Sequence, residues 1–171
     1  MKRHAGKVVV ALFLVAVVSL GAVDVWAQES GLAKQIQGTW ILVSMVNEQD
    51  GKKTEQYGPS PRGVQVFTPD GRFIAITMRA RLPKFASNNR LTGTPEEYKA
   101  VVQGSMAYFG TYKVVSEKEH LVSLHMEAST FANWEGEDQT RVMMVVGDEM
   151  KATNPTTTMG GTTYSVFKRV K

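Results

Sequence analysis

The sequence contains no cysteine among its 171 residues. Disulfide bonds, thiolate metal sites, cysteine nucleophiles and the lipid-modified cysteine of a bacterial lipoprotein are therefore excluded. A domain without disulfides depends on its hydrophobic core for stability, and a chain of this length is large enough to bury one.

Histidine is also scarce, with three residues in the chain, of which only His120 and His125 lie beyond the N-terminal segment. Without clustered carboxylates, two histidines do not make a zinc or iron site, so we expect no metal and no cofactor. The G-x-S-x-G elbow of serine hydrolases is absent as well. Catalytic motifs are thus missing, and a binding function is favoured over an enzymatic one.

Residues 1–27 have the pattern of a secretory signal peptide. Three basic residues precede an apolar run over residues 8–18, small residues follow, and Val25-Trp26-Ala27 fits a cleavage site. The apolar run is shorter than the roughly 20 residues that span a bilayer, so cleavage is favoured over an uncleaved anchor. We expect an exported bacterial protein, periplasmic or secreted, with one domain over residues 28–171 and no stable membrane anchor.

The net charge is small once this leader is set aside. Its removal leaves 17 basic and 15 acidic residues, so the formal charge falls from +4 to +2. No basic cluster is interleaved with aromatic residues either. A nucleic-acid partner is therefore not expected.

The rest of the chain reads as short strands joined by turns. Pro69-Asp70-Gly71 and Gly147-Asp148 are hairpin-type connections between β-branched and aromatic runs. The predicted strands cover residues 40–46, 63–68, 72–78, 107–115, 121–128, 139–146, 149–153 and 162–170. Strands of this length and spacing are typical of a sandwich or a closed barrel.

One helix interrupts the strands, between the third and the fourth. Thr94 and Glu97 form a capping box, with Pro95 at the first helical position, and the helix should end near Gly104. Tyr98, Val101 and Val102 fall on one face. We expect this stripe to lie over the barrel opening.

Gly38-Thr39-Trp40 opens the first strand and resembles the start of the lipocalin superfamily. There an indole closes one end of the barrel, and a cation from the last strand lies across it. Here Lys168 or Arg169 would do so. The pattern predicts that the last strand pairs back onto the first and seals a hollow cylinder.

Further motifs make the resemblance specific to the lipocalin-like domain family, also called lipocalin type 5, over nearly the whole chain after the leader. They are Gly38-Thr39-Trp40 with Leu42, Tyr57-Gly58-Pro59 with Pro61 and Gly63, Thr68-Pro69-Asp70-Gly71, Phe85-Ala86-Ser87, Gly93-Thr94-Pro95-Glu96-Glu97-Tyr98, Tyr108-Phe109-Gly110-Thr111-Tyr112, His125 with Glu127, Asn133-Trp134 with Gly136, and Gln139 with Arg141. The resemblance implies an all-β fold, an eight-stranded antiparallel up-and-down barrel with one short helix inserted between strands 3 and 4. It also implies a ligand cavity, but no common reaction.

His125 and Glu127 share one face of a strand whose other face is apolar. Alternation alone places them toward solvent. The resemblance argues for the interior, because a shared His, Glu and Arg are readily explained as lining a cavity. Arg141 on the next strand would then pair with them inside. We prefer the interior orientation, in which a buried ion pair is favoured over catalysis.

Aromatic residues supply the other candidates. Tyr108 and Tyr112 flank Gly110, which would leave room for a ligand between the two phenols. Trp134 lies on a loop. It either covers the barrel mouth as a lid or packs against the helix at Tyr98, and we prefer the packing.

The favoured function is a non-enzymatic barrel that binds a small hydrophobic or amphipathic molecule. An isomerase or cyclase that uses His125, Tyr108 or Tyr112, and Arg141 is the first alternative, and a structural barrel filled by side chains is the second. The candidate ligand-binding residues are Tyr98, Tyr108, Tyr112, His125, Glu127, Trp134 and Arg141, and the structural residues are Gly38, Trp40 and Arg169.

Overall fold

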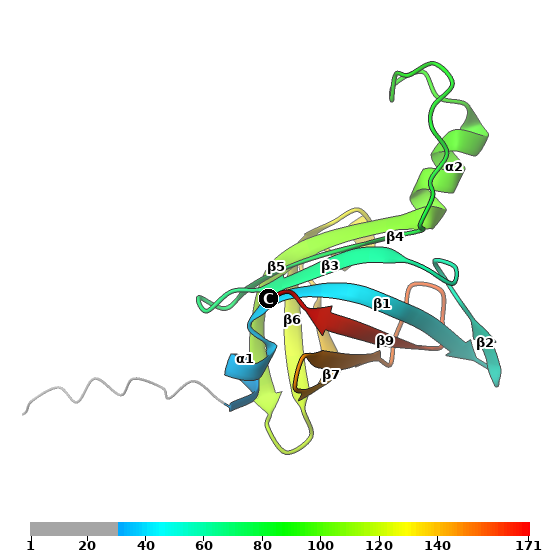
Figure 1. Cartoon of the computed structure of the whole chain (residues 1–171). Coiled ribbons are helices and arrows are strands. Elements are labelled where there is room, and N and C mark those ends of the chain that lie inside the picture. Colours follow the sequence, from blue (N-terminus) through cyan, green and yellow to red (C-terminus); the bar gives the residue numbers. More distant parts are fainter. Residues whose placement is uncertain (1–30) are drawn as a thin grey trace, which may run out of the picture.

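The structure is a computed structural model, and it describes residues 31–171. The signal peptide predicted over residues 1–27 lies outside the described residues. The elements are α1 (Gly31–Ile36), β1 (Gly38–Gln49), β2 (Lys52–Thr54), β3 (Arg62–Phe67), β4 (Arg72–Met78), α2 (Pro95–Gly104), β5 (Ser105–Ser116), β6 (Leu121–Ser129), the short 3-10 helix η1 (Ala132–Trp134), β7 (Asp138–Val146), β8 (Glu149–Asn154) and β9 (Thr162–Arg169). Figure 1 shows the strands curving around a common interior.

The strands form a closed antiparallel barrel. From β3 to β9 each strand pairs with the next along the chain, and β1 pairs with both β3 and β9. Trp40 lies opposite Arg169, and Glu48 lies opposite Thr162. The predicted all-β barrel of eight strands, closed by its first and last strands, is confirmed.

The structure contains one strand that was not predicted, β2, so every later strand is numbered one higher than in the prediction. The three residues of β2 pair only with the far end of β1, where Gln49 lies opposite Lys52. Because β2 precedes the hairpin of β3 and β4, the helix α2 follows β4. The predicted position of the helix between strands 3 and 4 is therefore not confirmed.

Helix α2 begins as predicted but projects away from the barrel. Thr94 and Glu97 form the capping box, with Pro95 in the first turn. The Tyr98 ring packs on Phe85 of the preceding loop at 5.6 Å, while Val102 is 75% exposed. The prediction that the apolar stripe covers the barrel opening is wrong for Tyr98, which packs on the loop before the helix (Figure 1), whereas Val101 and Val102 lie at the open end of the barrel.

Helix α1 closes the opposite end of the barrel. The Trp40 Nε1 donates to the Ile36 carbonyl at 2.7 Å, and the Arg169 guanidinium lies 4.1 Å from the centre of the indole ring. Arg169 also donates to the carbonyls of Gln37 and Gln35, at 2.6 and 2.7 Å. These contacts tie the first strand, the last strand and α1 together at the closed end.

The half of the interior next to α1 is filled by apolar side chains. The core consists of Leu32, Ile36, Trp40, Leu42, Phe67, Phe73, Val122, Leu124, Met126, Met143, Met150, Ala152 and Phe167. The rings of Phe67 and Phe73 occupy the space between the phenols of Tyr112 and Tyr108, with centroid distances of 5.2 and 6.0 Å. A ligand between the two tyrosines, as predicted, has no room there.

Gly110 leaves room for the backbone of β6 and not for a ligand. A Cβ atom at this position would lie 1.8 Å from a carbonyl oxygen of β6, at a bulge in the pairing of β5 with β6. The predicted role of Gly110 as a gap for a ligand is wrong, since the missing side chain allows the two strands to approach each other.

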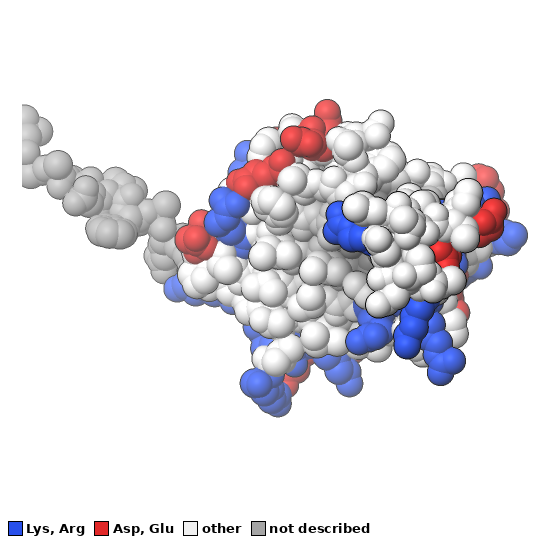
Figure 2. Space-filling model, turned by 90° about the horizontal axis from the view of Figure 1, so that it is seen from above, with Lys and Arg blue, Asp and Glu red and all other residues white. Residues whose placement is uncertain are grey.

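The outer surface of the barrel carries apolar side chains of its own. Ile74 on β4 and Phe109 on β5 lie opposite each other and are 51% and 43% exposed. Figure 2 shows the molecule from above, and few Lys, Arg, Asp or Glu residues lie in the middle of this face. Hydrophobicity alone therefore does not separate inside from outside on these strands.

No helix within residues 31–171 is long and apolar enough to cross a membrane.

Candidate functional site

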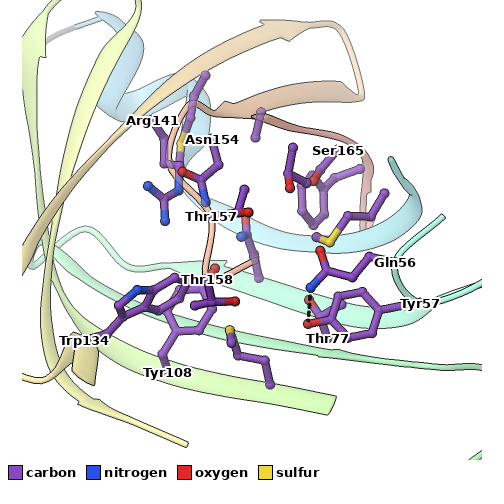
Figure 3. A pocket seen from close by; sticks show the side chains of 17 residues that line it. Gln56, Tyr57, Thr77, Tyr108, Trp134, Arg141, Asn154, Thr157, Thr158 and Ser165 are labelled. Atoms are coloured by element: carbon purple, nitrogen blue, oxygen red, sulfur yellow. Dashed lines mark hydrogen bonds between the residues drawn. The ribbon is translucent and has the colours of Figure 1, made fainter. Parts of the chain in front are cut away.

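The open half of the barrel contains a small chamber of about 60 Å³ (Figure 3). Its floor is formed by core residues such as Met143 and Phe167, and its walls come from several strands and loops. The remaining lining residues are Met45, Gln56, Tyr57, Gln65, Thr77, Met106, Tyr108, Trp134, Arg141, Ala152, Asn154, Thr157, Thr158, Thr163 and Ser165. Its volume equals that of about two water molecules, which is room for a small polar group but not for a whole drug-sized molecule.

A wider groove continues from this chamber toward solvent. It has a volume of about 650 Å³ and shares Gln56, Tyr57, Met106 and Thr158 with the chamber. The last turn of α2 and the loop after β6 add Val101, Val102 and Phe131, and the loop before β9 adds Met159. The groove is thus more apolar than the chamber and large enough for the body of a small molecule.

The chamber walls are polar because, in this half of the barrel, polar side chains of the strands face inward. Gln65, Thr77, Thr163 and Ser165 point inward and are each less than a tenth exposed. Except for Thr162, their outward neighbours are apolar or aromatic, and Tyr164 is 46% exposed. A polar interior of this kind favours a ligand with polar atoms.

Arg141 is the charged residue of the chamber. It lies on β7, points inward with Met143, and is 5% exposed. Its Nη1 donates to the Thr140 carbonyl at 3.0 Å, and its Nη2 donates to the Gln139 side chain. Burial lowers the pKa of Arg141, and Tyr108 beside it raises the pKa in part. Guanidinium groups stay protonated in proteins, so the chamber holds a positive charge.

This charge has no acidic partner among the described residues. The ion pairs found there join Lys53 to Glu48, Arg72 to Glu127, His125 to Asp138, Lys151 to Glu149 and Lys171 to Asp148. Glu137 and Asp138 line a second depression that Arg141 also borders, but neither forms an ion pair with it. A buried charge of this kind costs several kcal/mol of desolvation that neutral acceptors offset only in part.

Two further polar groups of the chamber bear on a ligand. The Gln65 Oε1 is buried and has no hydrogen-bond partner. Burial raises the pKa of Tyr57 to about 12, so its hydroxyl stays protonated and can donate. The Gln56 amide donates to the Tyr57 oxygen at 3.3 Å. The chamber therefore offers a donor and an acceptor in addition to the guanidinium.

The structure brings three of the predicted ligand-binding residues together. Trp134 meets Tyr108 edge to face at 5.4 Å, and the Arg141 guanidinium lies 6.0 Å from the Trp134 ring (Figure 3). Trp134 also meets Phe131 at 6.0 Å. The prediction that Trp134 packs against α2 at Tyr98 is wrong, because η1 turns the indole into the barrel mouth.

His125 and Glu127 lie on the outside of the barrel. The His125 Nδ1 lies 2.8 Å from Asp138 Oδ1, and Glu127 accepts from Arg72 at 2.6 Å. The preferred inward orientation is wrong for both residues, because the apolar side chains on the other face of β6 fill the core. His125 therefore lies on the opposite side of the barrel wall from Arg141.

Tyr112 and Tyr98 are also placed away from the chamber. The Tyr112 hydroxyl donates to the Thr68 carbonyl at 2.9 Å, near the closed end of the barrel. The Tyr98 hydroxyl accepts from the Gly93 amide at 2.8 Å and holds the loop before α2. Both phenols thus satisfy backbone groups of turns and loops.

Sequence reasoning missed most of the polar lining. Gln65 stands between two valines in the hairpin strand β3, and Thr163 and Ser165 alternate with Tyr164 and Val166 on β9. Polar and apolar residues alternate in both strands, but alternation alone does not say which of the two sets faces the interior. The signal that could have found them is the presence of apolar residues on both faces of β1, which already shows that this barrel has an apolar outside.

Comparison with known families gives the same fold. A family model described as a lipocalin-like domain matches residues 37–165. The chain belongs to this lipocalin-like domain family. A search of curated proteins found no match. The lipocalin-like fold is generally a small-molecule binder, and barrels of this strand number can hold one small ligand.

The described part of this lipocalin-like protein contains no group of three or more His, Cys, Asp or Glu side chains that could hold a metal ion.

Proposed function

We propose that this lipocalin-like protein binds a small amphipathic molecule at the open end of its barrel. The polar part of the ligand enters the chamber, and the apolar part lies in the groove beside α2. The observation that carries this proposal is the joining of a polar chamber of about 60 Å³ to a more apolar groove of about 650 Å³. The opposite end is closed by α1 and Trp40, so the ligand enters from one side.

The test uses N-phenylnaphthylamine, a neutral fluorescent amphipath, and the protein purified from cells that express the full chain. Ser165→Phe places a ring in the chamber, since Ser165 points inward. Val166→Phe is the matched control, because it adds a ring to the same strand on the outward side. We expect Ser165→Phe to weaken probe binding about tenfold or more, and Val166→Phe to leave it unchanged.

Two outcomes contradict the proposal. Probe binding that is equal in both variants places the probe outside the chamber. An absence of saturable binding to the unmutated protein shows that the chamber and groove do not act as a site. Thermal unfolding of each variant shows whether the barrel is intact.

We also propose that the protein is exported and that its leader is cleaved after Ala27. The support is the order of basic, apolar and small residues in residues 1–27. The measurement is the intact mass of the protein recovered from the periplasm and the medium. A mass that starts at Gln28 supports cleavage, and a full-length mass in the membrane fraction contradicts it.

A further inference from the structure

We propose that the ligand carries a carboxylate and that Arg141 binds it in the chamber. This inference rests on the proposed binding function and adds the chemical class of the ligand's head group.

The first reason is the unmatched charge of Arg141. Its side chain is 5% exposed, and no Asp or Glu of residues 31–171 forms an ion pair with it. Two of its N–H groups donate to Thr140 and Gln139 and another is directed at the Tyr108 hydroxyl, but a guanidinium carries five donors. In Figure 3 the guanidinium projects into the region bounded by Asn154 and Trp134. An anion there supplies the missing negative charge and accepts from the remaining donors.

The second reason is the size and charge of the chamber. Its lining contains no Lys, Asp or Glu and no second Arg. A carboxylate carries one negative charge and matches the planar fork of one guanidinium. A phosphate monoester carries nearly two charges, and the chamber lining has no second cation to match the other charge, since Arg79 lines the groove and not the chamber. The chamber of about 60 Å³ also suits the smaller group.

The third reason is the surrounding polarity. Tyr57 presents a protonated hydroxyl, and the Gln65 Oε1 is buried without a partner. Hydrocarbon placed against these groups would leave the Tyr57 O–H without an acceptor and the Gln65 oxygen without a donor, whereas a carboxylate accepts from Tyr57 and a water bound to that carboxylate can donate to Gln65. The apolar groove then takes the tail, with Val101, Phe131 and Met159 as its walls.

The experiment compares decanoate, decanol and decyl phosphate by isothermal titration calorimetry with the protein purified from cells that express the full chain. We expect decanoate to bind about tenfold or more tightly than decanol, because a hydrogen-bonded charge pair distinguishes them. Decyl phosphate should bind more weakly than decanoate.

The variants identify the residue. Arg141→Met removes the buried charge with little change in side-chain length. Arg141→Lys keeps the positive charge but replaces the planar guanidinium with an ammonium group. Arg62→Met is the control, because Arg62 is an exposed residue of β3 whose loss changes the net charge equally. We expect Arg141→Met to weaken decanoate about tenfold or more and decanol little, Arg141→Lys to restore part of the loss, and Arg62→Met to change neither.

Each outcome decides a different point. Equal affinities for decanoate and decanol in the unmutated protein, or an unchanged decanoate affinity in Arg141→Met, overturn the carboxylate assignment and leave amphipath binding standing. Tighter binding of decyl phosphate than of decanoate reassigns the head group and also overturns it. Loss of both decanoate and decanol in a folded Arg141→Met variant assigns Arg141 to the shape of the site rather than to the charge. Failure of N-phenylnaphthylamine to bind, by contrast, removes the proposed function itself.

Discussion

Replacing Arg169 with Met should open the closed end of the barrel. Arg169 is the point at which β9, α1 and Trp40 meet: its guanidinium lies 4.1 Å from the indole centre and donates to two carbonyls, at 2.6 and 2.7 Å. Methionine keeps the length and the apolar contact of the side chain but removes the cation and both donors.

The expected loss can be estimated from these contacts. A partly desolvated cation–π contact contributes about 1 kcal/mol. Each charge-assisted hydrogen bond to a partly buried carbonyl contributes on the order of 1 kcal/mol after exchange with water. We therefore expect Arg169→Met to lower the free energy of unfolding by about 3 kcal/mol, which is a large fraction of the 5–15 kcal/mol that is usual for a domain.

Urea unfolding followed by circular dichroism measures this loss. Lys168→Met is the matched control, because Lys168 is an exposed neighbour on the same strand, and its change should stay within about 0.5 kcal/mol. Arg169→Lys should recover less than half of the loss, since one ammonium cannot stack and reach both carbonyls. If Arg169→Met unfolds at the same urea concentration as the control, the cation does not hold the barrel closed and the reasoning is refuted.

Three further changes test other parts of the structure. Gly110→Ala should destabilise the barrel by about 3 kcal/mol or more in urea unfolding, because its Cβ would lie 1.8 Å from a carbonyl of β6, whereas Gly31→Ala, with open space around it, should be harmless. The pKa of Tyr57 is raised from 10.0 to about 12, so the folded state holds the phenol proton more tightly than the unfolded state does. The free energy of unfolding should therefore fall as the pH rises from 10.0 toward 12. A Tyr57→Phe variant whose free energy of unfolding falls equally steeply with pH would contradict this. His125→Ala should leave N-phenylnaphthylamine affinity unchanged, because His125 lies outside the barrel, while Tyr108→Ala should weaken it; a loss in His125→Ala would show that the outer face matters.

Local signals in the sequence were sufficient for the turns, the helix start and the closure. Pro69-Asp70-Gly71 joins β3 and β4 as predicted, because Gly71 adopts the positive φ of 79° that this turn requires. The capping box of Thr94 and Glu97 forms for an equally local reason, since both partners lie within one turn of the chain.

The orientation of side chains was predictable only where one face of a strand is clearly apolar. On β6 the alternation of Val122, Leu124 and Met126 indicated the core correctly, and the resemblance-based preference for His125 inside was the error. On β9 the same rule fails, because Thr163 and Ser165 face the chamber and Tyr164 faces solvent. Alternation identifies two faces but not which of them is the interior.

The sequence by itself therefore determined the barrel, its turns and its closed end, because strand period, turn residues and the Gly-x-Trp opening act through neighbouring residues or one paired strand. The tertiary structure alone decided which polar groups share the chamber. Arg141, Gln65 and Tyr57 come from β7, β3 and the loop before β3. Their convergence, and the absence of an acidic partner for Arg141 within residues 31–171, follow from how the strands close around the interior, a property that no single stretch of the chain contains.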